Sequence, residues 1–344
     1  MLRDHYFEEL AGEERYPFEL LRRAIADGAA ECTLPVADDA SVRRIWDAVV
    51  MDHPELVRYP GLKCYAQVSG RGTVIPLEYL DADEALYARR LEGMVRAVEA
   101  RLTPASSDYA VCKAIYDVIA GCVTYQSAVL EKYYRLDWEN SSQLQAFAAR
   151  HYSAFTPYGI VVHKKGVCQG IARLYKILCD RFGIECAWVK AASRQCGDRR
   201  EGDHALNVVE VNGTRAFVDV TNGLRQEGLP IVRYDFFLCS SRVIGRQYTV
   251  LGEFGCEDER VSYFARNGLR FTNKTALRRY LAAYVSAPRR SEVRVHYDAP
   301  DMDDGELRSF CLKILQAHCR EGRVAHGSAR CGFFSAIIKY DREE

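Results

Sequence analysis

The sequence contains one cysteine in a setting that suits a nucleophile. Cys168 follows Lys165-Gly166-Val167 and starts a segment with apolar residues at helical spacing, namely Ile171, Leu174, Tyr175, Leu178 and Phe182. Gly183 follows that segment as a helix stop. We therefore predict a helix that begins at Cys168, where free backbone N–H groups and the helix dipole favour a thiolate. A single cysteine is more commonly a small apolar side chain in the core. Other residues must therefore show whether Cys168 is a nucleophile or a core residue.

The segment after this helix predicts a β-hairpin. Residues 204–211 and 215–220 have strand patterns, and Asn212-Gly213 between them is a strong signal for a two-residue turn. Such a turn pairs residue 211 with 214, 206 with 219 and 204 with 221. His204 and Asp219 are then diagonal neighbours whose side chains project from the same face of the sheet.

These three residue types, in this order, predict a catalytic triad. An aspartate that accepts a hydrogen bond from one imidazole nitrogen fixes the tautomer and supports the imidazolium, while the other nitrogen faces the thiol. Taken singly, the three residues are also compatible with a core cysteine, a strand-edge histidine and a turn-forming aspartate. Their combination favours catalysis by Cys168, His204 and Asp219.

The same segments resemble a known family. Gly166-Val167-Cys168-Gln169-Gly170-Ile171-Ala172, the strand that starts with His204-Ala205-Leu206-Asn207, and Phe217-Val218-Asp219-Val220 together resemble the bacterial transglutaminase-like superfamily over residues 107–250. The resemblance implies an α+β fold with a papain-like core, in which the cysteine heads a helix packed on an antiparallel sheet. It also implies that Cys168, His204 and Asp219 are the catalytic residues.

Three further residues are weaker candidates for the site. Many relatives carry a tryptophan two residues after the histidine, where this chain has Leu206, so we expect Leu206 to pack beside the site and to affect substrate shape. The backbone N–H of Cys168 would supply one oxyanion donor, and Tyr158 or Gln169 a second. The sequence has no equivalent of the calcium site of animal transglutaminases.

The resemblance does not fix the reaction, because relatives include cross-linking enzymes, amide hydrolases, peptidases and proteins that have lost catalysis. We expect a cysteine acyl-transfer enzyme that acts on a peptide or protein amide through a thioester. Hydrolysis is favoured over transglutamination, because water is the default acceptor. The alternatives are a catalytically silent peptide-binding or scaffold module and, third, a zinc protein that uses the many cysteines.

Length and local patterns predict the domain organisation. A chain of 344 residues with 48% hydrophobic content is long enough for two or three domains. Pro104-Ala105-Ser106-Ser107-Asp108 reads as a linker and helix N-cap, and the pattern changes again after residue 250. We predict an N-terminal helical or α+β domain (1–105), a catalytic core (106–250) and a small α+β appendage (251–344).

Several shorter segments also carry predictions. Strands are expected over 62–68 and 73–80, helices over 83–102 and 108–120, and a polar loop over 192–203. The polar and aromatic stretch between Tyr125 and Tyr158 forms either a lid or cleft wall beside the nucleophile or, more simply, a surface loop. In the C-terminal part His296, His318 and His326 are interpreted as structural, since their spacing shows no metal-ligand set.

Charge and cysteine content indicate which classes of partner and which cellular location to expect. Lys plus Arg and Asp plus Glu number 47 each, so no nucleic-acid or membrane partner is expected, and the N-terminal residues carry charges where a signal peptide has an apolar core. We expect a cytoplasmic location, with a secreted form that has lost a leader left open. The 13 cysteines show no C-x-x-C pair and no zinc spacing, which predicts reduced core cysteines, no metal and no cofactor.

Overall fold

The structure is a computed structural model of the chain. It describes residues 2–61, 67–69, 72–137, 140–194, 204–286, 291–319 and 322–340. For residues 67–69 and Ser141 it describes the backbone and not the side chains. The strand predicted over 62–68 and the loop predicted over 192–203 therefore lie largely outside the described residues, as do Cys64 and Cys196.

The N-terminal segment combines helices with a small antiparallel sheet whose strand order is β1-β3-β2. Its elements are α1 (His5–Glu9), α2 (Gly12–Ala26), β1 (Glu31–Leu34), α3 (Asp39–Asp52), β2 (Gln67–Ser69) and β3 (Gly72–Pro76). The Asp38 side chain caps α3 by accepting a hydrogen bond from the backbone N–H of Ser41. The apolar side of α3 packs in a cluster that also contains Cys168, Trp188 and Ala205, so this segment is in direct contact with the predicted site.

The segment between the N-terminal sheet and Cys168 is mainly helical. Its helices are α4 (Glu84–Glu99), α5 (Asp108–Cys122), α6 (Ser127–Tyr134), α7 (Ser141–His151), the 3-10 helix η1 (Tyr152–Phe155) and α8 (Pro157–His163). The helix start predicted at residue 108 is confirmed, because the Ser107 side chain accepts a hydrogen bond from the backbone N–H of Ala110. Helices α6, α7 and η1 make up most of the described residues between Tyr125 and Tyr158. This stretch therefore differs from the surface loop that was the simpler of our two expectations.

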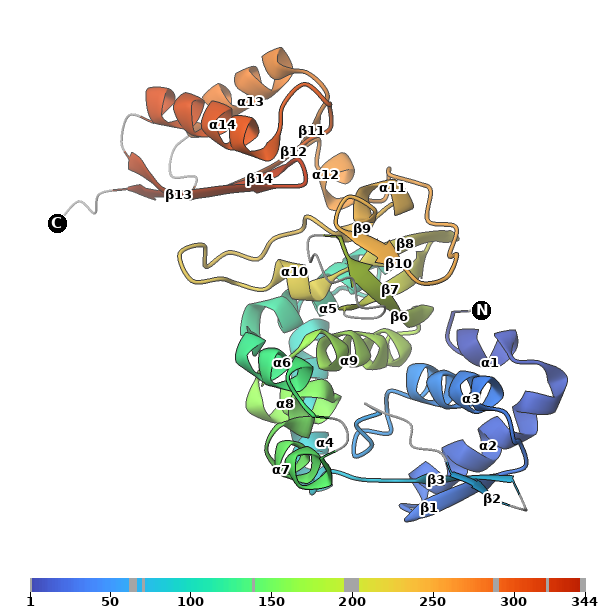
Figure 1. Cartoon of the computed structure of the whole chain (residues 1–344). Coiled ribbons are helices and arrows are strands. Elements are labelled where there is room, and N and C mark those ends of the chain that lie inside the picture. Colours follow the sequence, from blue (N-terminus) through green and yellow to red (C-terminus); the bar gives the residue numbers. More distant parts are fainter. Residues whose placement is uncertain are drawn as a thin grey trace.

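The helix predicted at Cys168 is present as α9 (Cys168–Arg181), and Gly183 follows it with a φ of 74°. It lies against an antiparallel sheet with the strand order β10-β6-β7-β8-β9 (Figure 1). The strands are β6 (Cys186–Ser193), β7 (His204–Val211), β8 (Thr214–Val218), β9 (Phe237–Cys239) and β10 (Tyr248–Val250). Ile171, Leu174 and Leu178 of α9 are buried in one core with residues of these strands, each such side chain contributing about 1.5–3 kcal/mol.

The predicted hairpin register is confirmed over β7 and β8. Val211 pairs with Thr214 and Asn207 with Val218, and Asn212 and Gly213 have φ values of 51° and 76°. The strand is shorter than predicted, however. β8 ends at Val218, and Asp219 becomes the N-cap of the short helix α10 (Val220–Gly223), so the pairing of residues 204 and 221 does not form.

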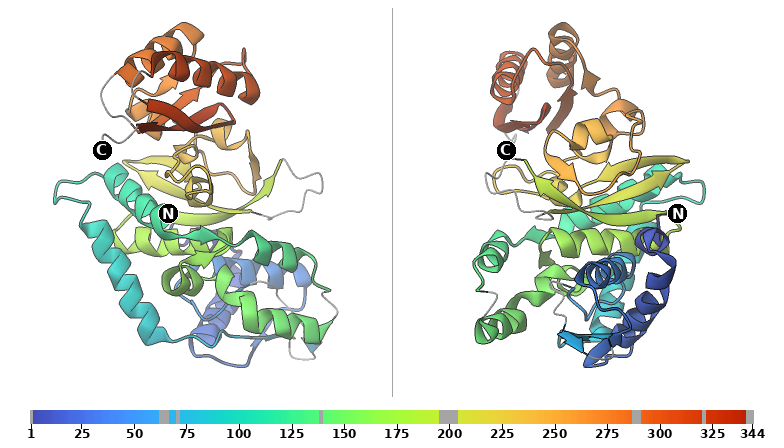
Figure 2. Two further views of the ribbon diagram at one scale, coloured as in Figure 1. Left: turned by 90° about the vertical axis from the view of Figure 1, so that its left-hand side faces the viewer. Right: turned by 45° about the vertical axis from the view of Figure 1, so that its right-hand side comes forward.

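The C-terminal part is an α+β unit on the far side of the central sheet from the N-terminal segment, as the views in Figures 1 and 2 show. After α11 (Ser241–Ile244) come α12 (Tyr263–Arg266), β11 (Arg270–Phe271), α13 (Lys274–Ser286), β12 (Glu292–Tyr297), α14 (Asp304–His318), β13 (Gly322–Arg330) and β14 (Phe333–Tyr340). The strand order is β11-β12-β14-β13, and α13 and α14 share a core with this sheet. Strand β13 was not predicted, because its sequence is polar and contains two glycines.

Candidate active site

Cys168 is the first residue of α9, after an extended Val167 (φ −113°, ψ 176°), and the residue is 6% exposed. The preceding strand β5 (Lys165–Gly166) pairs in parallel with β4 (Thr124–Tyr125), which fixes the chain just before the cysteine. Gly170 is needed for the close packing of this helix start, because a Cβ there would lie 2.9 Å from the Thr156 carbonyl oxygen. The local structure therefore holds the thiol at the helix N-terminus rigidly.

His204 and Asp219 are hydrogen-bonded to each other. The distance from His204 Nε2 to Asp219 Oδ2 is 3.0 Å, the Asp219 side chain is fully buried, and the His204 side chain is 10% exposed. The carboxylate accepts from Nε2, which leaves Nδ1 as the ring nitrogen available to a thiol. The other oxygen of Asp219 accepts a hydrogen bond from the backbone N–H of Asn222 at 3.0 Å, because Asp219 caps α10.

The electrostatics of the pair favour a charged histidine. Burial lowers the pKa of His204, but the charge of Asp219 and hydrogen bonds to Asp219 and Cys168 outweigh burial and raise this pKa to about 10. Burial raises the pKa of Asp219, yet the charge of His204 and the hydrogen bonds from His204 and Asn222 bring it below its usual value. His204 thus interacts with Asp219 through a hydrogen bond and with Cys168 electrostatically, which is the order that a thiol-imidazole-carboxylate triad requires.

Cys168 and His204 line one cleft of about 190 Å³. Helix α3 forms one wall and α6 another, on either side of α9 in Figure 1. The side chains that line the cleft beside the two reactive groups are mainly aromatic or apolar: Trp46, Val50, Leu130, Tyr133, Tyr134, Phe155, Val167, Trp188 and Ala205. Asp47 and Lys190 add an ion pair of 2.6 Å at the same cleft.

Residues 77–223 match the model of a protein family described as EDR1/CTR1/ARMC3, peptidase-like. The matched region contains Cys168, His204 and Asp219 and is similar to a family described as peptidase-like. The α+β architecture with a cysteine-bearing helix on an antiparallel sheet, which the resemblance implied, is confirmed.

Solved structures are similar at low sequence identity. A crystal structure described as a TGase is 13% identical with a TM-score of 0.28, over 56% of this chain and 50% of that one. A candidate cysteine protease from Cytophaga hutchinsonii is 13% identical with a TM-score of 0.26, over 56% and 71% of the two chains. A candidate protease from Parabacteroides distasonis is 10% identical with a TM-score of 0.25, over 46% and 36%. A comparison with curated protein sequences finds no match.

The three weaker candidates of the sequence analysis, Gln169, Tyr158 and Leu206, lie in three different places. Gln169 lines the cleft, but its Nε2 donates to the Pro60 carbonyl at 3.1 Å. Tyr158 lies outside the cleft, because α8 packs on α4 and directs its hydroxyl to the backbone N–H of Asp83 (3.3 Å). Leu206 is 1% exposed within the core under the sheet and does not line the cleft either. Tyr158 and Leu206 therefore do not lie at the cleft, where we expected them.

Two tyrosines near His204 and Cys168 were not predicted from the sequence. Tyr248 at the start of β10 stacks on the His204 ring, with centroids 4.4 Å apart and planes at 5°. Its hydroxyl accepts a hydrogen bond from Asn222 Nδ2 at 3.3 Å and lies close enough to Asp219 to help lower the pKa of that carboxyl. The Tyr125 hydroxyl interacts with the Cys168 thiol, and burial, with Cys168 as the next cause, raises the pKa of Tyr125 so that its hydroxyl remains protonated and can donate.

Metal-binding geometry is absent from the part of the chain that the structure describes. No group of three or more His, Cys, Asp or Glu side chains there could hold a metal ion. His296 is buried and stacks on Phe333 with ring centroids 4.1 Å apart, which is the position of a packing residue. None of the described helices is both long and apolar enough to cross a membrane.

Proposed function

We propose that this protein is a cysteine-nucleophile acyl-transfer enzyme that acts on peptide or protein amide bonds. The observation that carries the proposal is the connection of Cys168 to His204 in a cleft, with His204 Nε2 held 3.0 Å from the buried carboxylate of Asp219. A binding module that had lost catalysis would have no need to bury an ion pair behind a thiol, since burying charges is costly.

The chemistry follows from the positions of the atoms. Cys168 Sγ attacks the amide carbonyl carbon, while His204 Nδ1 takes the thiol proton and then gives it to the leaving amine nitrogen, so that the C–N bond breaks and a thioester forms. The backbone N–H of Cys168 and the Tyr125 hydroxyl are the proposed donors to the oxyanion. Asp219 keeps Nε2 protonated and stabilises the imidazolium during both proton transfers.

Hydrolysis is the proposed fate of the thioester. Water attacks the carbonyl carbon, His204 takes its proton, and the C–S bond breaks to give a carboxylic acid and the free thiol. The aromatic side chains Trp46, Tyr133 and Trp188 favour an acyl group with an apolar or aromatic side chain near the scissile bond.

Alkylation by iodoacetamide at pH 6, with the labelled site located by mass spectrometry, tests the nucleophile. We expect Cys168 to react fastest, because burial raises the pKa of Cys256 and Cys311 to about 12. The exposed Cys122, replaced in Cys122→Ser, is the matched control whose loss should leave the labelling unchanged. If no cysteine reacts faster than a free thiol, a catalytically silent peptide-binding module becomes the better description.

Turnover is tested with peptide amides that differ in the residue before the scissile bond. Release of acid and amine indicates hydrolysis, whereas incorporation of an added fluorescent primary amine indicates transglutamination. Cys168→Ala should abolish both and destabilise the fold by about 1 kcal/mol, because only one buried sulfur is lost. Activity that persists in Cys168→Ala would remove the cysteine from the mechanism.

A further inference from the structure

The C-terminal hairpin reaches the back of the proposed site. Strands β13 and β14 are joined at Cys331 and Gly332, which have φ values of 53° and 81°. Asp304, the first residue of α14, holds this turn, because its carboxylate accepts hydrogen bonds from the backbone N–H groups of Cys331 and Gly332, both at 2.8 Å. Residues 330–332, here called the hairpin tip, are therefore fixed from within the C-terminal unit.

Arg330 in the hairpin tip is hydrogen-bonded to two side-chain amides of the central region. Its Nε donates to Gln247 Oε1 at 3.2 Å, and its Nη1 donates to Asn222 Oδ1 at 3.4 Å. Asn222 in turn donates its backbone N–H to Asp219 and its Nδ2 to the Tyr248 hydroxyl. Gln247 directly precedes Tyr248. Arg330 is therefore linked through one intermediate residue to each of two groups beside the His204 ring. Asn222 links it to Asp219, and Gln247 links it to Tyr248.

The charge of Arg330 has a buried counterpart. Asp235 is 6% exposed, and burial raises its pKa, while the charges of Arg233, Arg330 and Arg294 act in the opposite direction. The Arg330 guanidinium thus donates to two amide oxygens and adds a favourable charge near Asp235, whose own ion pair is with Arg233 at 4.0 Å. An exposed arginine gains little stability from pairing, whereas Arg330 is half-buried. Its hydrogen bonds therefore form a specific contact between the C-terminal unit and the central region.

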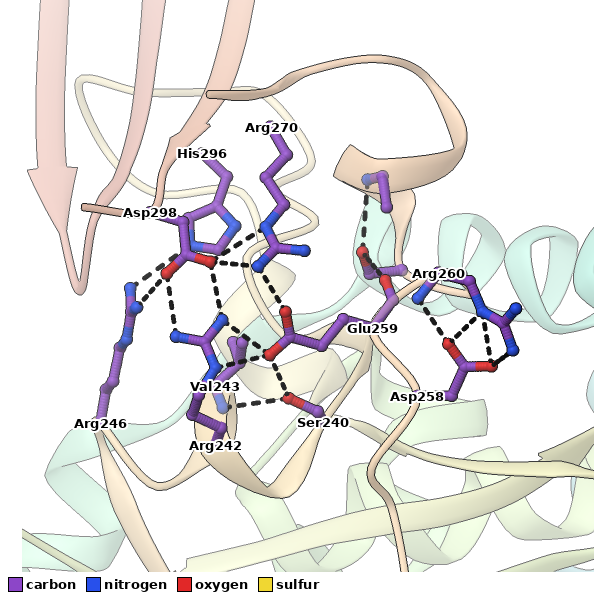
Figure 3. A network of polar contacts seen from close by, with 12 residues as sticks. Ser240, Arg242, Val243, Arg246, Asp258, Glu259, Arg260, Arg270, His296 and Asp298 are labelled. Atoms are coloured by element: carbon purple, nitrogen blue, oxygen red, sulfur yellow. Dashed lines mark hydrogen bonds and ion pairs between the residues drawn. The ribbon is translucent and has the colours of Figure 1, made fainter. Parts of the chain in front are cut away.

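A second network holds the hairpin tip and the Tyr248 segment together. Figure 3 shows Asp298, just after β12, surrounded by Arg242, Arg246 and Arg270, all ion-paired to its carboxylate. Arg246 also donates from Nη1 to the Cys331 carbonyl at 3.1 Å. Because Arg246, Gln247 and Tyr248 are consecutive, this network anchors the chain that carries Tyr248 to the same hairpin tip that carries Arg330.

We propose that Arg330 is a positioning residue for the triad. By holding Asn222 and Gln247 in place, it keeps Asp219 and Tyr248 against His204, which makes the C-terminal unit a working part of the active site. The catalytic consequence rests on the proposed function, whereas the effect on the His204–Asp219 hydrogen bond does not.

The hydrogen bond itself provides the first test, by NMR of the His204 Nε2 proton in the full-length protein. Arg330→Ala should speed the exchange of this proton with water by at least about threefold, since coupling through one intermediate residue is of modest size. Arg330→Lys keeps the charge but not the paired donors, and should also speed exchange. Arg323→Ala, which removes an exposed arginine of the same strand, should leave exchange as in the wild type.

Alkylation of Cys168 by iodoacetamide across pH 5 to 9 provides the second test. Arg330→Ala should slow labelling at pH 6 by at least about threefold. In a protein that already carries Asn222→Ala and Gln247→Ala the same change should have no further effect, because both partners through which Arg330 acts are then gone. Equal proton exchange in wild type, Arg330→Ala and Arg330→Lys would overturn the positioning role even if Cys168 is reactive. Faster exchange in these variants with an unreactive wild-type Cys168 would instead overturn the proposed function and keep the positioning role.

Discussion

Asp219 accepts one hydrogen bond with each of its carboxylate oxygens, from His204 Nε2 and from the backbone N–H of Asn222, both at 3.0 Å. The second bond exists because Asp219 is the N-cap of α10 and not the last residue of β8. The carboxylate cannot turn away from His204 without uncapping that helix. A local backbone feature therefore fixes the orientation of the group on which the imidazole depends.

Replacement of this carboxylate by an amide should separate orientation from folding. In Asp219→Asn the side-chain oxygen can still cap α10, but the amide group can donate to Nε2 and stabilise the wrong tautomer. We expect turnover of a peptide amide to fall by about two to four orders of magnitude. Circular dichroism should show an unchanged fold. Asp258→Asn, at an exposed ion pair with Arg260 that lies outside the cleft, is the control and should retain full turnover.

Tyr248 offers a matched pair of substitutions. Tyr248→Phe keeps the ring stacked on His204 but loses the hydroxyl that accepts from Asn222 Nδ2 and helps to lower the pKa of Asp219, whereas Tyr248→Ala loses both the ring and the hydroxyl. We expect kcat to fall by up to about tenfold in Tyr248→Phe, the value of one hydrogen bond, and by more in Tyr248→Ala. KM should change little, because Tyr248 does not line the cleft. A change in KM alone would indicate that the ring binds substrate.

The Tyr125 hydroxyl is the proposed second oxyanion donor, and Tyr125→Phe removes it without changing ring packing. Acylation by a peptide amide should slow by about ten- to hundredfold, because a hydrogen bond to a developing negative charge is lost. Stopped-flow measurement of acyl-enzyme formation reports this step directly. Tyr158→Phe is the control, because Tyr158 lies on α8 away from the cleft. Equal losses in the two variants would indicate a general effect on packing.

The sequence predicts the triad because its signals are local. The apolar spacing after Cys168 specifies where α9 begins, and Asn212-Gly213 specifies the register that brings His204 beside Asp219. Both depend on residues close in the chain. The α+β fold follows from the same elements, since a helix with one apolar face needs a sheet to cover it.

The remaining parts of the site depend on contacts between distant segments. Tyr248 reaches His204 only because β10 pairs with β6, where Tyr248 lies opposite Ser193, and no turn signal specifies that strand order. The cleft wall from α3 and the approach of Arg330 likewise arise from packing of whole units. Leu206 and Tyr158 were misplaced for a related reason, because spacing along the chain does not show which buried side chains open into a cleft.

The ion pair should give the protein a specific dependence of stability on pH. The pKa of His204 is raised to about 10 in the folded protein, so its contribution is fully present below its unfolded value of 6.5 and is lost as pH rises towards 10. The pKa of Asp219 is lowered, so its contribution is present above its unfolded value of 3.8 and is lost only as pH falls below it. The stabilisation from the pair is therefore largest between these two unfolded values.

Urea unfolding of wild type and Asp219→Asn at pH 5.5, 7.5 and 9.5 measures this dependence, because subtracting the two free energies of unfolding cancels the groups that both proteins share. We expect the difference to be largest at pH 5.5 and to shrink at each higher pH, by at most about 1.4 kcal/mol per pH unit. If the difference stayed constant or grew with pH, His204 would be neutral in the folded protein, and Asp219 would act on it through a neutral hydrogen bond alone.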